Sequence, residues 1–165
     1  MAHRTSNPRF DASDGARCLL CVDDHPEVLA IMGEFLRVSG YSVLTAPSGA
    51  RGLQLLQRNP VDAVILDYEM PKMDGAELAL RIKSDRPELP VLMFTGYPAD
   101  VPEDVRRSVD AFVVKGDPAE KLLQTIRDLV PANGDGAPQK AAGRERSRKR
   151  NGRSAPSARR VRHPA

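Results

Sequence analysis

The chain has no tryptophan and only two cysteines, and aromatic residues make up 4% of its 165 residues. Two cysteines cannot form a disulfide framework, which excludes the class of small, disulfide-stapled secreted domains. No apolar run approaches the roughly 20 residues that cross a bilayer. Residues 1–14 also lack the apolar stretch that a signal peptide needs. We therefore expect a cytoplasmic protein without a membrane span.

The formal net charge of +3 conceals a strong asymmetry along the chain. Residues 132–165 contain ten lysines and arginines and two acids, a charge of +8, which leaves +3 − 8 = −5 for the remainder. This basic segment has almost no large apolar residue and cannot bury enough surface to offset its ordering entropy. We predict a disordered N-terminal tail over residues 1–16, one domain over residues 17–131 and a basic disordered tail over residues 132–165.

Short apolar runs alternate with amphipathic segments through the predicted domain. The runs predict five strands, at residues 17–22, 41–46, 61–66, 90–94 and 110–114. The segments between and after them predict helices at residues 26–38, 48–58, 75–85 and 118–130, with a short additional helix punctuated by Pro98 and Pro102. Asp117 is the expected N-cap of the last helix, with Pro118 at its first position. Five consecutive β-α units predict a parallel sheet that is covered by helices on both faces.

Two short patterns near the first predicted strand have an ordinary structural interpretation. Cys18 and Cys21 have CxxC spacing, but an odd separation in a strand sends two side chains to opposite faces. We therefore predict two buried structural thiols in place of a redox or zinc site. His25 precedes Pro26 at a helix start, and a capping or exposed role is favoured over metal binding.

Polar residues follow the predicted strands at their C-terminal ends. Asp23 and Asp24 follow the first strand, Asp67 the third, Thr95 the fourth and Lys115 the fifth. These ends share one edge of a parallel sheet, where such sheets bind ligands. Clustered carboxylates repel one another unless a cation lies among them, and hard oxygen ligands suit Mg²⁺, with Mn²⁺ as an expected substitute. A hydroxyl and an ammonium group beside them suit a phosphoryl group, so we predict attack of Asp67 on a phosphoryl donor.

Four motifs, in this order and at the usual separations, are similar to those of one family: Val22-Asp23-Asp24, Leu66-Asp67-Tyr68-Glu69-Met70-Pro71-Lys72-Met73-Asp74-Gly75, Phe94-Thr95-Gly96 and Val113-Val114-Lys115. Over residues 17–130 the chain resembles the receiver domain of two-component response regulators, of the stand-alone type. The resemblance implies a flavodoxin-like, doubly wound (βα)5 parallel sheet with strand order 2-1-3-4-5. It also implies that Asp67 is the phosphoacceptor for a sensor histidine kinase or a histidine phosphotransfer protein.

The resemblance further implies two sets of ligands around Asp67. The expected Mg²⁺ ligands are the side chains of Asp23, Asp24 and Asp67 and the backbone carbonyl of Glu69. The residues expected to contact the phosphoryl group are Thr95 and Lys115.

Three other positions have implied roles around the phosphoryl group. Phe112, three residues before Lys115, matches the aromatic residue that moves inward when Thr95 shifts. Glu69 and Tyr97 flank the path of the attacking water and are expected to tune the lifetime of the phosphoryl group. Gly116 departs from the family, which usually has proline there, and we expect no cis peptide bond at this position.

Three function classes remain open from the sequence. The leading one is a receiver that switches protein–protein contacts through its fourth helix, fifth strand and fifth helix, and that catalyses only its own phosphorylation and dephosphorylation. The second is a receiver-like binding module that takes no phosphate, which the intact acidic set argues against. The third is a phosphorylation-regulated protein whose basic tail binds nucleic acid non-specifically, or an acidic partner. The downstream protein and any phosphorylation-dependent dimer stay unidentified.

Overall fold

A computed structural model describes residues 16–130 of the chain. The predicted tails fall outside this range, except for the last residue of the N-terminal one. The strands and helices follow one another in the order β1 (Cys18–Val22), α1 (Pro26–Val38), β2 (Ser42–Ala46), α2 (Gly49–Arg58), β3 (Ala63–Leu66), α3 (Gly75–Asp85), β4 (Val91–Thr95), the 3-10 turn η2 (Pro98–Asp100), α4 (Glu103–Ser108), β5 (Ala111–Val114) and α5 (Ala119–Leu129).

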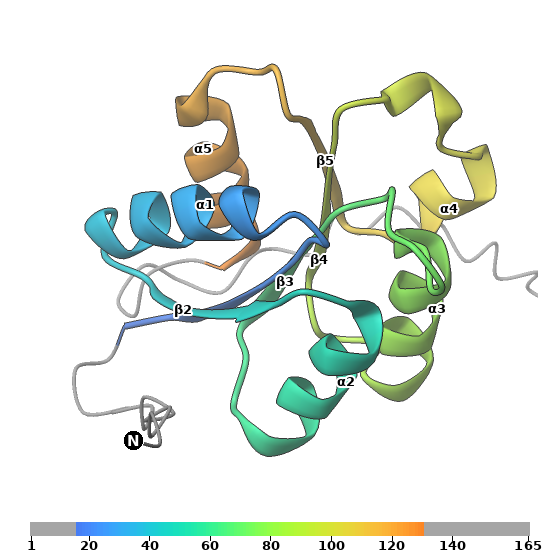
Figure 1. Ribbon diagram of the computed structural model, residues 1–165, viewed down its shortest axis with the longest axis horizontal. Helices are drawn as coiled ribbons and strands as arrows, with labels where there is room; N and C mark the ends of the chain where they lie inside the picture. The colour runs from blue at the N-terminus through green and yellow to red at the C-terminus, as the bar shows by residue number, and fades with distance from the viewer. Residues whose placement is uncertain (1–15, 131–165) are drawn as a thin grey trace, which may run out of the picture.

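The five strands form one parallel sheet in the order β2-β1-β3-β4-β5, as the sequence predicts. Helices α1 and α5 lie against one face, and α2, α3 and α4 lie against the other (Figure 1). The chain leaves β1 for one side of the sheet and later returns to the other side as β3. This change of direction between neighbouring strands is where ligands bind in open α/β sheets.

Side chains alternate between two apolar layers because successive residues of a strand point to opposite faces. In β1, Leu19 and Cys21 pack in the layer under α1 and α5, whereas Leu20 and Val22 pack in the layer under α2, α3 and α4. All five residues of β1 are buried, which is expected for a central strand covered on both faces. The helices contribute Leu29, Met32, Leu36, Leu122 and Ile126 to the first layer and Leu56, Leu78, Ala79, Ile82 and Val105 to the second.

The two cysteines are free thiols buried in β1, in agreement with the sequence analysis. Burial raises the pKa of Cys18 to about 11 and that of Cys21 to about 12. A thiol with such a pKa has almost no thiolate at neutral pH and is inert. Among residues 16–130, no helix has the length and apolar character needed to cross a membrane.

The predicted start of the last helix is wrong by one residue. Helix α5 begins at Ala119, and Pro118 occupies the N-cap position without a side-chain capping bond. Asp117 is not the N-cap because its carboxylate is engaged elsewhere. Its Oδ2 accepts hydrogen bonds from the backbone N–H of Val114 at 3.0 Å and from Nζ of Lys121 at 2.7 Å.

Two predicted strands are shortened at their N-terminal ends by aspartates. Strand β3 begins at Ala63 after Asp62, and β5 begins at Ala111 after Asp110. The two proline interruptions also act as predicted, since the segment after β4 divides into η2 and the six-residue helix α4. Within the described range there is no cis peptide bond, so the bond after Lys115 is trans, as expected.

Candidate functional site

Two buried aspartates lie side by side at the C-terminal edge of the sheet. Asp23 follows β1 and Asp67 follows β3, with only 3% and 4% of their surfaces exposed. The backbone N–H of Asp67 donates to the carbonyl of Val22 at 2.9 Å, and that of Asp23 donates to the carbonyl of Ala46 at 3.2 Å. These bonds continue the parallel ladders one residue past the strands, so the sheet itself fixes the two carboxylates at neighbouring positions.

Lys115 joins the two carboxylates from the end of β5. Its Nζ lies 2.8 Å from Oδ2 of Asp23 and 2.8 Å from Oδ2 of Asp67, and its backbone N–H donates to the carbonyl of Thr95 at 2.9 Å. Burial raises the pKa of Asp67, although Lys115 opposes this shift. Burial works against the charge of Lys115, yet its hydrogen bonds to Asp23 and Asp67 raise its pKa overall. One ammonium shared by two buried carboxylates leaves uncompensated negative charge at this edge.

The acidic side chains also fit a divalent cation. Among residues 16–130, Oδ1 of Asp67 is buried without a hydrogen-bond partner, an arrangement that costs free energy unless a cation or donor meets it. Ligand atoms of Asp23, Asp24, His25 and Asp67 all lie within 4.8 Å of one another. Carboxylate oxygens in this number, partly open to water, are the ligands that Mg²⁺ prefers. The donor set therefore fits Mg²⁺.

The ring of His25 lies beside the two acids that precede it in the chain. It occupies the N-cap position of α1 but makes no side-chain capping bond, and its ring is exposed, as predicted. Its Nδ1 lies 3.2 Å from Oδ1 of Asp23 and 3.1 Å from Oδ1 of Asp24. The hydrogen bond to Asp23 and the charge of Asp24 raise the pKa of His25. The sequence signal for this placement is its position directly after two acids.

Thr95 and Phe112 flank the site on β4 and β5. Thr95 is the last residue of β4 and is fully buried, and its hydroxyl accepts a hydrogen bond from the backbone N–H of Tyr97 at 3.2 Å. Tyr97 is 60% exposed in the segment that follows. Phe112 is half-buried, pairs with Met93 across the sheet and packs against the layer under α2, α3 and α4. The hydroxyl of Thr95 is thus held by the backbone after β4.

The loop between β3 and α3 folds back onto Asp67. The backbone N–H of Gly75 donates to the carbonyl of Tyr68 at 2.9 Å, and a Cβ at position 75 would lie only 2.2 Å from the carbonyl oxygen of Asp67. Only glycine permits this close backbone approach. Asp74 then caps α3, since its Oδ1 accepts from the backbone N–H of Glu77 at 2.8 Å. Glu69 is exposed within this loop, two residues after Asp67.

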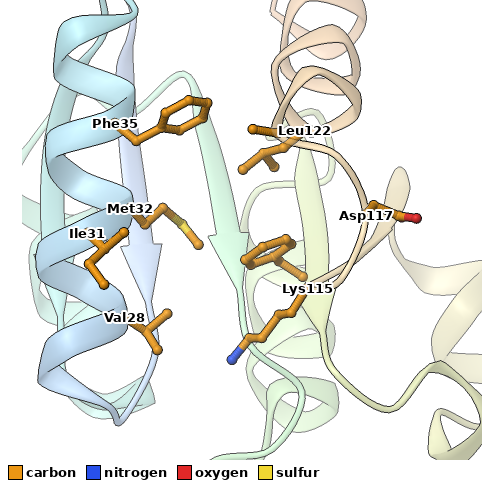
Figure 2. Close-up of a pocket in the computed structure, with 9 residues that line it drawn as sticks. Val28, Ile31, Met32, Phe35, Lys115, Asp117 and Leu122 are labelled. Carbon is orange, nitrogen blue, oxygen red and sulfur yellow. The ribbon is translucent and has the colours of Figure 1, made fainter.

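An apolar groove of about 400 Å³ opens between α1 and α5 beside Lys115. Figure 2 shows side chains of α1 facing Leu122 across the groove, with the stem of Lys115 at one end. Ile31 of α1 is 73% exposed at its margin. The lining residues are Val28, Ile31, Met32, Phe35, Phe94, Lys115, Asp117, Ala119 and Leu122.

A doubly wound parallel sheet in the order 2-1-3-4-5, with acids, a buried threonine and a lysine at one edge, defines the flavodoxin-like class of α/β domains. The model of the response regulator receiver domain matches residues 19–127, so the chain belongs to the receiver domain family of response regulators. Receiver domains are regulatory domains of two-component signalling and are not enzymes in the usual sense.

Curated relatives share this domain and are longer than the matched region. The transcriptional regulatory protein GlrR of Escherichia coli (strain K12) is 40% identical over 115 residues, which cover 68% of this chain and 26% of GlrR. The response regulator MprA of Mycobacterium sp. (strain KMS) is 35% identical over 115 residues, which cover 68% of this chain and 50% of MprA. The chain therefore spans between a quarter and a half of the length of these relatives.

Solved structures agree with the fold over nearly their whole length. The response regulator TrrA of Thermotoga maritima, in complex with Mg²⁺ and BeF, has a TM-score of 0.64 and 29% identity, covering 69% of this chain and 99% of that chain. TrrA in complex with the histidine kinase ThkA has a TM-score of 0.65 and 29% identity, covering 68% of this chain and 97% of that chain.

Proposed function

We propose that this protein is a phosphorylation-controlled switch that accepts a phosphoryl group on Asp67 from a histidine kinase or a histidine phosphotransfer protein. The observation that carries the proposal is the state of the Asp67 carboxylate. Oδ2 is held by Lys115 at 2.8 Å, whereas Oδ1 is buried and has no hydrogen-bond partner within the described range. A carboxylate oriented by one oxygen and unengaged at the other is suited to act as a nucleophile.

In the proposed reaction an oxygen of Asp67 attacks the phosphorus of a phosphohistidine. The new P–O bond forms as the P–N bond breaks, the imidazole leaves with the P–N electron pair and takes up a proton, and an acyl phosphate results. Lys115 offsets the charge on the phosphoryl oxygens, and the hydroxyl of Thr95 is a further donor once it leaves Tyr97. The side chains of Asp23, Asp24 and Asp67 and the backbone carbonyl of Glu69 would hold Mg²⁺, or Mn²⁺ as the expected substitute, which would add charge neutralisation at the site.

The output follows from the charge that the acyl phosphate adds. A phosphoryl group brings roughly −1.5 to −2 units of charge and three acceptor oxygens. We expect the hydroxyl of Thr95 to exchange its bond with Tyr97 for one with a phosphoryl oxygen, and Phe112 to move inward behind it. The surface formed by α4, β5 and α5 would then change its protein contacts. The chain would catalyse only its own phosphorylation and dephosphorylation.

The groove between α1 and α5 supports a protein as the phosphoryl donor. It is apolar, it is open, and Lys115 of the site lines one end of it. A helix of a donor protein lying in this groove would bring its phosphohistidine to Asp67. The structurally similar TrrA is described in complex with the histidine kinase ThkA, which agrees with this assignment of partner.

Acetyl phosphate, a small donor, tests the assignment of Asp67. Wild-type protein with Mg²⁺ should gain the mass of one phosphoryl group, located on Asp67 by peptide mass spectrometry. The Asp67→Ala variant and wild type treated with a chelator should gain none. Label on another residue, or equal labelling of Asp67→Ala, would refute the proposal.

Glu69 and Tyr97 are proposed to tune the lifetime of the acyl phosphate from the path of the attacking water. For Glu69→Ala we expect the autodephosphorylation rate to change about tenfold while the labelling rate changes less than about twofold, since general acid–base or water-orienting effects are of this size or larger. The decay of purified phosphoprotein and the rise of label with acetyl phosphate measure the two rates. Equal changes in both rates would refute the proposed role of Glu69.

A further inference from the structure

Arg106 of α4 contacts three separate parts of the chain. Its Nε donates to the backbone carbonyl of Val101 at 3.1 Å, and its Nη2 donates to the carbonyl of Pro98. The guanidinium carbon also lies 5.2 Å from the centre of the Phe112 ring, within the range of a cation–π contact. One side chain therefore connects both ends of η2 with the half-buried ring on β5.

The segment that Arg106 holds also holds Thr95. The backbone N–H of Tyr97 donates to the hydroxyl of Thr95 at 3.2 Å, and the carbonyl of Tyr97 accepts from the N–H of Asp100 at 3.2 Å. Pro98 directly follows Tyr97. A continuous series of contacts thus runs from the Thr95 hydroxyl through this short segment to Arg106 and on to the Phe112 ring. Both side chains that the proposed function requires to move are tied to one guanidinium.

We propose that Arg106 is a positioning residue that locks the segment 97–101 and the Phe112 ring together, in the arrangement where Thr95 is bonded to Tyr97. This inference rests on the proposed function only for its trigger, phosphorylation of Asp67. Arginine suits the position because its planar group holds several donors in a fixed fork and can lie flat over an aromatic ring, whereas the ammonium of lysine is a compact point charge without that geometry. Loosening this lock should make the movement of Thr95 and Phe112 easier.

The neighbouring Arg107 provides a matched control. It lies on the same short helix and is exposed, and it forms a surface ion pair with Glu103 at 3.2 Å. Arg106→Met keeps most of the aliphatic stem and removes the hydrogen bonds and the charge. Arg107→Met removes the same charge from the same helix without touching the proposed lock.

The first measurement needs no phosphorylation. In the full-length protein, hydrogen exchange of the Tyr97 amide should be about threefold or more faster in Arg106→Met than in wild type, because contacts of this kind stabilise by about 0.5–1 kcal/mol, a factor of about 2–5. Arg107→Met should match wild type, and Arg106→Lys should resemble Arg106→Met. Unchanged exchange in Arg106→Met, or the same increase in Arg107→Met, would overturn the proposal.

The second measurement links the lock to the switch through acetyl phosphate labelling. We expect Arg106→Met to label about threefold faster than wild type, and this gain to be smaller when Phe112→Leu is already present, since a double-mutant cycle shows non-additive effects for coupled residues. The same fold gain in the Phe112→Leu background would overturn the coupling. Failure of wild type to label would refute the proposed function instead, and the exchange measurement would then still decide whether Arg106 locks the segment.

Discussion

At the N-terminal edge of the sheet two aspartates accept hydrogen bonds from the backbone. At the C-terminal edge two other aspartates share one lysine. Asp62 donates its N–H to the carbonyl of Cys18 and accepts the N–H of Cys18 through Oδ2, at 2.8 and 2.7 Å. Asp110 makes the same reciprocal pair with Val91, at 2.9 and 2.8 Å, and also pairs with Lys83. These carboxylates accept hydrogen bonds from backbone N–H groups at the start of neighbouring strands, and each also pairs with a basic side chain.

Asp67 at the C-terminal edge has the same chemistry as Asp62 and Asp110, but its hydrogen-bonding capacity is only partly satisfied. Asp23 and Asp67 share Lys115, and one oxygen of Asp67 has no partner among the described residues. The backbone N–H groups of Asp23 and Asp67 continue the ladders here, and the backbone N–H of His25 donates to Oδ1 of Asp23 at 2.9 Å, whereas Oδ1 of Asp67 is left without a partner among the described residues. An aspartate at a strand end is therefore not by itself a functional signal. Burial combined with an unmet oxygen separates the two edges.

Replacing the lysine at each edge by alanine should give the largest difference in labelling. Lys115→Ala removes the charge shared by Asp23 and Asp67, and we expect acetyl phosphate labelling to slow by about a hundredfold, the usual effect of removing one electrostatic stabiliser of a transition state. Lys83→Ala breaks the pair with Asp110 and the bond to the carbonyl of Leu89, and labelling should stay within about twofold.

Circular dichroism melts at saturating Mg²⁺ serve as the control for folding in both lysine variants. If both variants stay folded and lose labelling equally, the proposal that only the C-terminal edge takes part in labelling is wrong. A Lys115→Ala protein that labels normally would remove Lys115 from the proposed site.

Much of the fold is readable from the sequence because each strand is a short apolar run and each helix has an apolar stripe. The clustering of Asp23, Asp67 and Lys115 is likewise readable, since parallel strand ends must share an edge. The roles assigned to these residues stay predictions. The apolar pattern runs past Asp62 and therefore predicts a strand that includes it, because periodicity does not show that its carboxylate replaces a ladder acceptor.

Other features depend on three-dimensional contacts that no local pattern encodes. Asp117 has the residue type and position of an N-cap, yet its carboxylate turns back to Val114. Arg106 gave no signal, since its contact with Phe112 requires the orientation of a six-residue helix relative to β5. The place of His25 at a helix start predicts a capping or exposed role, whereas its ring lies against the two acids before it.

Breaking a satisfied carboxylate at the N-terminal edge should affect stability and leave labelling intact. Asp110→Ala leaves the fully buried Val91 without the acceptor of its N–H, which should cost about 1–3 kcal/mol of unfolding free energy. The midpoint of urea unfolding measures this loss. Asp110→Asn retains an acceptor oxygen and should recover most of it, so an Asn variant as unstable as the Ala variant would contradict the proposed backbone role.

The smallest expected effect concerns Asp117. It lies near the C-terminal edge of the sheet, but its contacts are of the kind that Asp62 and Asp110 make at the N-terminal edge. Its N–H donates to the carbonyl of Val114 and its Oδ2 accepts from the N–H of Val114, the same reciprocal pair that Asp62 and Asp110 make. The hydrogen bond with Lys121, followed by that with Val114, lowers the pKa of Asp117 below its ordinary 3.8.

Because the folded state lowers this pKa, the carboxylate stabilises the protein above the pKa of the unfolded chain. That stabilisation is lost as the pH falls from about 3.8 through the lower folded value. Wild type should therefore melt slightly above Asp117→Asn at neutral pH, and the two melting curves should converge under acid conditions. Labelling by acetyl phosphate should be similar in both proteins. A melting difference that grows as the pH falls would mean that Asp117 acts differently from Asp62 and Asp110. The role of an aspartate in this sheet would then depend on which edge it occupies more than on whether its oxygens have hydrogen-bond partners.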